Sequence, residues 1–180
     1  MKQWLVTVLL LALVFVSGCG GGQVAVFFAD PQLEAAVRQA IGEHERDILL
    51  SDVEDLACLE APSAGISDLC GLEHCAALVE LDLSQNEIVG IAQLGELLYL
   101  TRLDLQGNRI ADIGPLIYLL RLVEIDLSHN RIADIQPLVN NPGVSLGDRL
   151  DLRGNPLNQA SLQIHIPELE GRGVQVRYEG

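Results

Sequence analysis

The chain has 180 residues and a formal net charge of −14, and 49% of its residues are hydrophobic although only 4% are aromatic. A chain of this length can bury a sizeable core without a metal or disulfides, and here leucine, isoleucine, valine and alanine must build that core. The negative charge repels phosphate backbones, so the composition argues against nucleic acid as a partner.

Residues 1–18 have the three regions of a secretory signal peptide: Lys2, an apolar run from Trp4 to Val16, and small residues before Cys19. The run is shorter than the roughly 20 residues that a bilayer-spanning helix needs. Its ending, VSGC, resembles the bacterial lipobox, which implies cleavage before Cys19 and lipidation of that cysteine. Residues 19–26 are then a lipidated cysteine with a flexible tether. This resemblance implies a lipid-anchored protein of the bacterial cell envelope, at the outer membrane.

Residues 27–55 are predicted to form a helical cap. The sequence DPQLEAAVRQAIG, residues 30–42, begins with an aspartate N-cap and a proline at the first helical position, and it ends with glycine. A capping box of Ser51 with Glu54 predicts that another helix begins there.

Residues 56–157 repeat one pattern about five times. Leucines recur as L-x-x-L-x-L-x-x-N, and the asparagines Asn86, Asn108, Asn130 and Asn155 are 22, 22 and 25 residues apart. A period of this length is typical of a solenoid. This sequence pattern resembles the leucine-rich repeat, in which the asparagine satisfies backbone groups at the turn after each strand. The asparagines are therefore expected to have a structural role.

The repeats depart from regularity in two places. In the first copy Ala64 replaces the asparagine and Pro62 interrupts the strand end, and a three-residue insertion lies near residues 140–145. The back half of each copy, with prolines at Pro115 and Pro137, is expected to form a tight turn of 3₁₀ type.

Residues 158–180 are predicted to cap the other end, with a helix over 158–166 and a closing strand in GVQVRYEG. A helical cap, 22-residue repeats and a closing strand together resemble internalin-like bacterial proteins. The resemblance implies an α/β solenoid, a right-handed superhelix whose parallel sheet forms the concave face.

Outward-facing strand positions carry most of the charged residues in the repeats. One position holds Asp82, Asp104, Asp126 and Asp151, and the position two residues earlier holds Glu80, Arg102, Glu124 and Arg149. Strands about 4.8 Å apart would align the aspartates in a column, and the arginines are expected to bridge into it. Gln106 and His129 lie close by in sequence. The aspartates either keep the strands soluble or form a docking surface, whereas a calcium site would need more oxygen ligands than one per strand supplies.

Neither a catalytic nor a metal site is expected. Ser145 matches G-x-S-x-G in GVSLG, but a strand rather than a helix follows, so this segment is predicted to be a turn. The four histidines lack metal-ligand spacing. Cys75 is expected to fill the core or to bridge to Cys70, and Cys58 to be a free thiol on the concave face.

These observations predict a non-catalytic, membrane-anchored leucine-rich-repeat protein that binds another protein or peptide with a basic patch through its concave face. No cofactor, metal ion or small-molecule substrate is expected. The alternative is a structural or adhesion component of the envelope that contacts the host or the cell wall. A carbohydrate-binding role would require stacking aromatics on the strands, and Tyr99 and Tyr118 fall on the return side of the coil.

Overall fold

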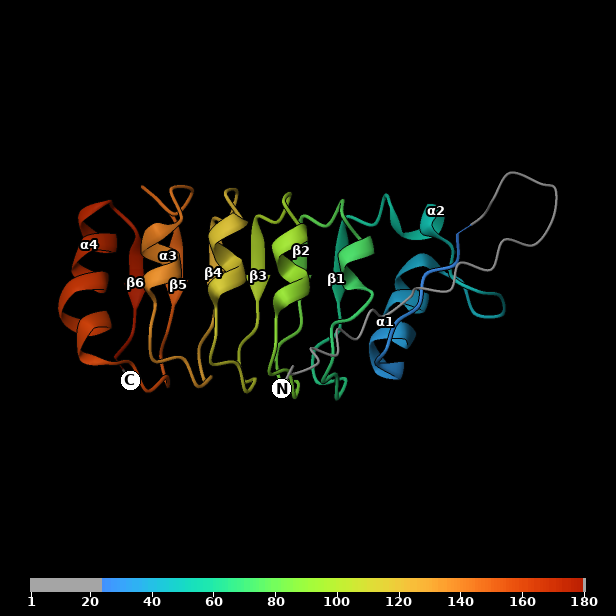
Figure 1. The fold of residues 1–180 in the computed structure, drawn as a ribbon, viewed down its shortest axis with the longest axis horizontal. Coiled ribbons are helices and arrows are strands. Elements are labelled where there is room, and N and C mark those ends of the chain that lie inside the picture. The colour runs from blue at the N-terminus through green and yellow to red at the C-terminus, as the bar shows by residue number, and fades with distance from the viewer. Residues whose placement is uncertain (1–23, 180) are drawn as a thin grey trace, which may run out of the picture.

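Every coil between residues 58 and 177 contributes a three-residue strand to one parallel sheet. The computed structural model describes residues 24–179, and Figure 1 shows the coils as a row between helices at the two ends. The strands lie side by side in chain order, which confirms the solenoid. They are β1 (Cys58–Glu60), β2 (Glu80–Asp82), β3 (Arg102–Asp104), β4 (Glu124–Asp126), β5 (Arg149–Asp151) and β6 (Gln175–Arg177).

The core consists almost entirely of aliphatic side chains stacked from coil to coil. The middle residue of each strand is in register with that of the next, as in Leu81 with Leu103 and Leu103 with Ile125, and these side chains are buried. Among the described residues, Phe28 is the single aromatic side chain in this core. The aliphatic core expected from the composition is therefore present.

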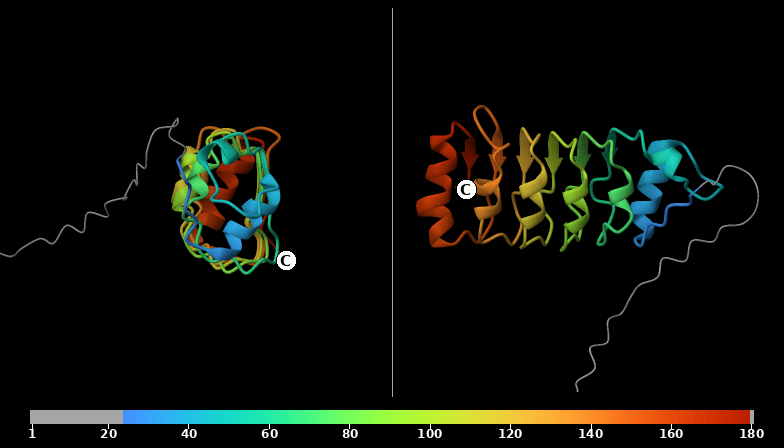
Figure 2. Two further views of the ribbon diagram at one scale, coloured as in Figure 1. Left: turned by 90° about the vertical axis from the view of Figure 1, so that its right-hand side faces the viewer. Right: turned by 45° about the horizontal axis from the view of Figure 1, so that its top comes forward.

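On the side away from the sheet each coil returns through a short helix (Figure 2). Three of these are 3₁₀ helices, as expected: η1 (Leu72–His74), η2 (Ala92–Glu96) and η3 (Gly114–Tyr118). The fourth, α3 (Gln136–Asn140), is an α-helix instead. Its coil is three residues longer, and Asn141 Nδ2 donates to the carbonyls of Leu116 at 2.8 Å and Leu119 at 3.0 Å.

The repeated asparagines link each coil to the coil before it. Asn108 Oδ1 accepts the N–H of Ile88 at 3.0 Å, and its Nδ2 donates to the carbonyls of Leu83 at 2.9 Å and Leu105 at 3.0 Å. Asn86 and Asn130 make the same set of contacts one coil away on either side. Asn155 makes it at the last repeat, where it is only half-buried. These amides satisfy backbone groups that regular strand pairing leaves unbonded.

The N-terminal helix α1 (Pro31–Ile41) is fixed to the first coil through its N-cap residue. Asp30 Oδ1 accepts the N–H of Gln32 at 2.8 Å, and its Oδ2 accepts the N–H of Ser67 at 2.8 Å and that of Asp68 at 3.2 Å. Burial alone would raise the pKa of Asp30, but these backbone donors hold it below its ordinary value. One carboxylate thus caps a helix and binds it to a repeat.

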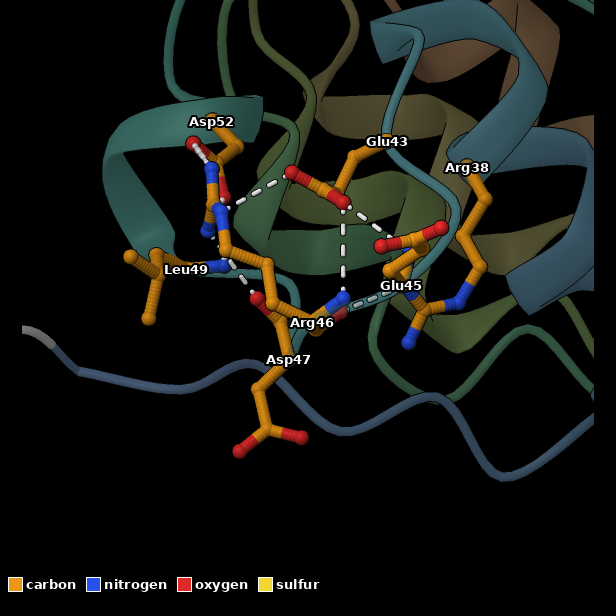
Figure 3. Close-up of polar contacts among 7 residues, drawn as sticks. All are labelled: Arg38, Glu43, Glu45, Arg46, Asp47, Leu49 and Asp52. Atoms are coloured by element: carbon orange, nitrogen blue, oxygen red, sulfur yellow. Dashed lines mark hydrogen bonds and ion pairs between the residues drawn. The ribbon is translucent and has the colours of Figure 1, made fainter.

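The second helix, α2 (Leu50–Val53), begins two residues earlier than predicted, with Leu49 instead of Ser51 as its N-cap residue. The expected capping box of Ser51 with Glu54 is wrong, because Asp52 Oδ2 accepts the N–H of Leu49 at 2.8 Å and takes that role. Arg46 joins Asp52 and Glu43, each at 2.8 Å (Figure 3). Backbone N–H groups, first that of Glu45, lower the pKa of Glu43, and the bond from Arg46 lowers that of Asp52.

The C-terminal helix begins within one residue of the predicted range of 158–166, but it ends later, at Gly171. A π-helical turn, η4 (Ser161–His165), leads directly into α4 (Ile166–Gly171). Ser161 fixes the start of this segment, since its hydroxyl donates to the carbonyl of Ala133 at 2.9 Å and accepts the N–H of Ile135 at 3.2 Å. Burial of Ile166 and Leu169 extends the helix past the predicted end. The predicted closing strand is β6, in parallel pairing with β5.

The substitution Asn108→Ala should destabilise the fold by about 2–4 kcal/mol, because it leaves the buried N–H of Ile88 and carbonyls of Leu83 and Leu105 without partners. Denaturant titration of the free energy of unfolding would measure this. Asn155→Ala is the matched control, and its half-buried site predicts a smaller loss. An equal loss at both sites, or none at Asn108, would contradict the burial argument.

Candidate functional site

The outward side chains of the six strands form two parallel lines on the face of the sheet. The register aligns Cys58, Glu80, Arg102, Glu124, Arg149 and Gln175 in the first line, and Glu60, Asp82, Asp104, Asp126, Asp151 and Arg177 in the second. We call these twelve residues the sheet face. They line a hollow of about 620 Å³. All eight strand residues that the sequence placed on the concave face therefore lie together here.

The arginines of the first line pair within that line. Arg102 lies 3.4 Å from Glu80 and 2.9 Å from Glu124, and Arg149 lies 2.8 Å from Glu124. The expectation that they bridge into the aspartate column is wrong, because the register sets each arginine directly beside a glutamate of the neighbouring strand. These exposed pairs add little stability. They do neutralise most of the charge of their own line.

The aspartates of the second line each accept a hydrogen bond from the backbone two residues later. Oδ1 of Asp82, Asp104 and Asp126 accepts the N–H of Ser84, Gln106 and Ser128, each at 2.9 Å. This turn, in which an aspartate bonds the chain at the strand end, was not foreseen from the sequence. The bond fixes each carboxylate group, while Oδ2 of these three residues makes no hydrogen bond within residues 24–179.

Asp104, in the middle of the aspartate column, and Asp151, at its C-terminal end, differ in electrostatics. Burial raises the pKa of Asp104, and the charges of Asp126 and Asp82 add to the effect, although the N–H of Gln106 opposes it. At Asp151 burial also acts to raise the pKa, but Arg153 reverses the direction and holds it below its ordinary value. Arg153 binds both carboxylate oxygens, with Nε 3.0 Å from Oδ1 and Nη2 2.7 Å from Oδ2. The unmatched charge thus lies toward the N-terminal coils.

Gln106 and His129 lie beyond the strands. Gln106 is half-buried, and Ser84 and Ser128 at the same position are buried, so this position faces the hollow less than the strands do. His129 is exposed at the turn with φ of 55°, and its ring lies where a side chain at Gly154 would stand. His129 therefore packs along the rim instead of lining the hollow.

The sequence reasoning missed Glu60, Gln175 and Arg177 as members of the sheet face. Glu60 lies 22 residues before Asp82, so the repeat period alone could have identified it. Arg177 lies 26 residues after Asp151, an interval that the C-terminal helix changes and the period does not predict. With Glu60 included, the second line begins with five carboxylates and ends with a guanidinium.

The three described cysteines are free thiols. Cys75 fills the core, where burial and, secondarily, the charge of Glu73 raise its pKa to about 12. Cys58 is exposed at the edge of the sheet face, as expected, and Cys70 is partly exposed without a bridge to Cys75. Ser145 lies in the loop between α3 and β5, where its N–H donates to Asp148 at 2.7 Å. The strand that follows is incompatible with a nucleophile elbow.

Between residues 24 and 179, no three His, Cys, Asp or Glu side chains are grouped so that they could hold a metal ion. Over the same residues, no helix has the length and apolar character to cross a membrane.

Comparison with known proteins agrees with this architecture. A family model described as leucine-rich repeats in two copies matches residues 100–140. No curated protein has a sequence close enough to the chain to match it. Among solved structures, an internalin (inlF) from Listeria monocytogenes is 22% identical with a TM-score of 0.68, and the match covers 85% of this chain. An internalin C2 (inlC2) from the same species is 18% identical with a TM-score of 0.41, covering 90% of this chain and all of the other.

The chain spans about half of the first of these internalins, with 52% of that protein covered. The TM-score shows a shared fold, in which short parallel strands are stacked coil upon coil. The repeat match at residues 100–140, the sheet and this likeness agree, and the chain has a leucine-rich-repeat fold similar to that of an internalin.

Proposed function

We propose that this protein is a non-catalytic module, anchored by lipid at Cys19, that binds a basic segment of another protein on its sheet face. The observation that carries the proposal is the uncompensated charge of that face. Its hollow is lined by seven carboxylates and three guanidiniums. The first line pairs its charges internally, so the excess lies in the column from Glu60 to Asp126.

Ionised Asp104 costs the fold stability, which favours a binding role for the column over simple solubility. Serine, threonine or glutamine would keep an outward strand position soluble without repulsion between neighbouring strands. At Asp104 the raised pKa records that burial and like charge both oppose ionisation. A cationic group of a bound partner would pair with this carboxylate and offset the cost of its ionisation.

The geometry of the face favours fast, selective and salt-sensitive binding. Strand pairing and the bonds from Ser84, Gln106 and Ser128 hold the carboxylates in place before a partner arrives, which lowers the ordering cost of binding. Like-signed charge in a hollow steers a basic partner and raises the association rate. None of the lining residues is aromatic, so the side chains that usually supply most affinity are absent from this hollow. We therefore expect modest affinity.

The anchor rests on the sequence alone, since Cys19 lies outside the described residues. The VSGC motif and the preceding apolar run support it. Two or three acyl chains would hold the module at a membrane, at about 0.8 kcal/mol for each buried methylene. Sorting to the outer membrane of a bacterial envelope is part of this proposal.

Reversal of two column charges, Asp104→Arg with Asp126→Arg, should lower partner capture about tenfold or more, because each arginine would repel a basic partner. A photo-cross-linking residue in place of Gln106, introduced in intact cells, would measure the yield and identify the captured protein. Glu45→Arg with Glu170→Arg makes the same charge change outside the sheet face and should leave capture unchanged. Equal yields from both double variants would rule out the sheet face as the docking site.

The substitution Asp104→Asn should raise the free energy of unfolding at pH 7, because the amide can still accept the N–H of Gln106 and carries no charge. A raised pKa means that ionisation disfavours the folded state above that pKa. The gain should shrink as the pH falls through the raised pKa and vanish below the ordinary value of 3.8. Denaturant titrations between pH 3 and 7 would follow it. Asp151→Asn should do the reverse at pH 7, since Arg153 lowers the pKa of Asp151.

The substitution Cys19→Ser should release the chain from the membrane pellet or leave it with an uncleaved leader, because serine cannot form the thioether to lipid. Fractionation with metabolic labelling by palmitate would show loss of label. Cys58→Ser is the control and should change neither. Label that persists in the Cys19 variant would contradict the proposed anchor.

A further inference from the structure

The turn that leads into each strand exposes side chains that neither the core nor the sheet face uses. The residues four and three positions before the strands repeat at the same place in every coil. We call them the amino-end ridge: Glu54, Asp55, Ala76, Ala77, Leu98, Tyr99, Leu120, Arg121, Ser145, Leu146, Gly171 and Arg172. None of them lines the hollow of the sheet face.

The middle of this ridge is apolar and exposed. The exposed fractions are 53% for Leu98, 52% for Tyr99, 54% for Leu120 and 82% for Leu146. From Ala76 to Leu146 the ridge carries no carboxylate, although the chain has a net charge of −14. Its single charge there, Arg121, stacks on the ring of Tyr99 with 4.8 Å between the guanidinium carbon and the ring centroid. A contiguous exposed strip of this kind marks an interaction surface.

When two copies of the ridge lie antiparallel, the residues that face each other are complementary in charge or size. At the position three residues before each strand, the ridge runs from Asp55 through Ala77, Tyr99, Arg121 and Leu146 to Arg172. Laid against a second ridge in the opposite direction, an acid meets a base, a small residue meets a large one, and an aromatic ring meets a cation. Self-complementarity under a two-fold rotation is what an isologous dimer requires.

We propose that the amino-end ridge is a self-association surface on which two copies of this chain pair antiparallel. The two-fold axis passes between the coils of β3 and β4, so that the Tyr99 and Arg121 stack of one copy faces that of the other. Asp55 lies opposite Arg172 of the second copy, and Ala77 lies opposite its Leu146.

Charge complementarity selects a second copy over a membrane as the occupant. Glu54 and Asp55 are exposed at one end of the ridge and have no ion pair among residues 24–179. A bilayer laid along the ridge would desolvate these carboxylates or repel them with anionic headgroups. A second copy brings Arg172 to the same place, where its guanidinium already bonds Glu168 at 2.6 Å and the carbonyl of Val139 at 2.7 Å, so Asp55 would extend an existing ion pair.

The pairing is small and depends on local concentration. Six coils spaced by about 4.8 Å give a ridge roughly 24 Å long, which is short for a stable dimer. Copies in one envelope meet more often than copies in dilute solution, so the test belongs in cells. Because the ridge and the sheet face share no residue, the inference goes beyond the proposed function and can hold or fail without it.

Cysteine trapping in intact cells tests the antiparallel arrangement with the full chain. One copy carries Ala77→Cys and a second, differently tagged copy carries Leu146→Cys, both with Cys58→Ser and Cys70→Ser. Mild oxidation should link the two tags at least tenfold more than it links Ala77→Cys to itself. In the proposed dimer two Ala77 sites are three coils apart, about 14 Å, beyond the roughly 7 Å reach of a disulfide.

Two controls make the outcome decisive. Val89→Cys in both copies places an exposed thiol on the opposite rim, with 59% of the valine exposed, and should give no link. Leu120→Asp in both copies should reduce the Ala77 to Leu146 link about tenfold while leaving photo-capture through Gln106 unchanged. The proposal is overturned by linkage of Ala77→Cys to itself, by linkage to a different protein, by a link that survives Leu120→Asp, or by no link in a chain that unfolds as the parent does.

Discussion

The structure depends on hydrogen bonds that each coil makes to its neighbour. A three-residue strand cannot persist alone, and the turn after it leaves backbone groups that only the adjacent coil can satisfy. Asn108 supplies those partners with one amide, bonding both its own coil and the preceding one. Stability is therefore shared between neighbours, and register is fixed throughout the stack.

Because the register is fixed, the sequence determines which side chains are neighbours on the surface. Residues one period apart must lie side by side, so a repeated aspartate becomes a column of like charge and a glutamate alternating with arginine becomes a line of ion pairs. The two lines run on the same strands but differ in electrostatics. The first is neutralised from within, whereas the second has only Arg153 and Arg177 near its C-terminal end. This asymmetry places the excess charge toward the N-terminal coils.

The parts of the fold that obey the period were predictable from the sequence, and the parts that depend on one local contact were not. The strand register, the asparagine contacts and the Asp30 N-cap follow from spacing and residue type. The start of α2 depended instead on Asp52, whose carboxylate accepts the N–H of the N-cap residue Leu49, and the end of the C-terminal helix depended on burial of Ile166 and Leu169. At the site, the columns were predictable, but the partners of the arginines and the fixation of each aspartate by a backbone N–H depend on side-chain geometry that the repeat period does not specify.

The same repeat that builds the sheet face also builds the amino-end ridge, yet the two surfaces are under different constraints. On the strands, neighbouring side chains are about 4.8 Å apart, so charge in one coil acts on the next. On the turns, Leu98 and Leu120 are exposed, while the adjacent residues Leu97 and Leu119 are buried and hold the backbone. The exposed apolar side chains of these turns therefore add no packing to the core of their own coil. The exposed leucines and tyrosine contribute to stability when another surface covers them, as in the proposed pairing of two ridges.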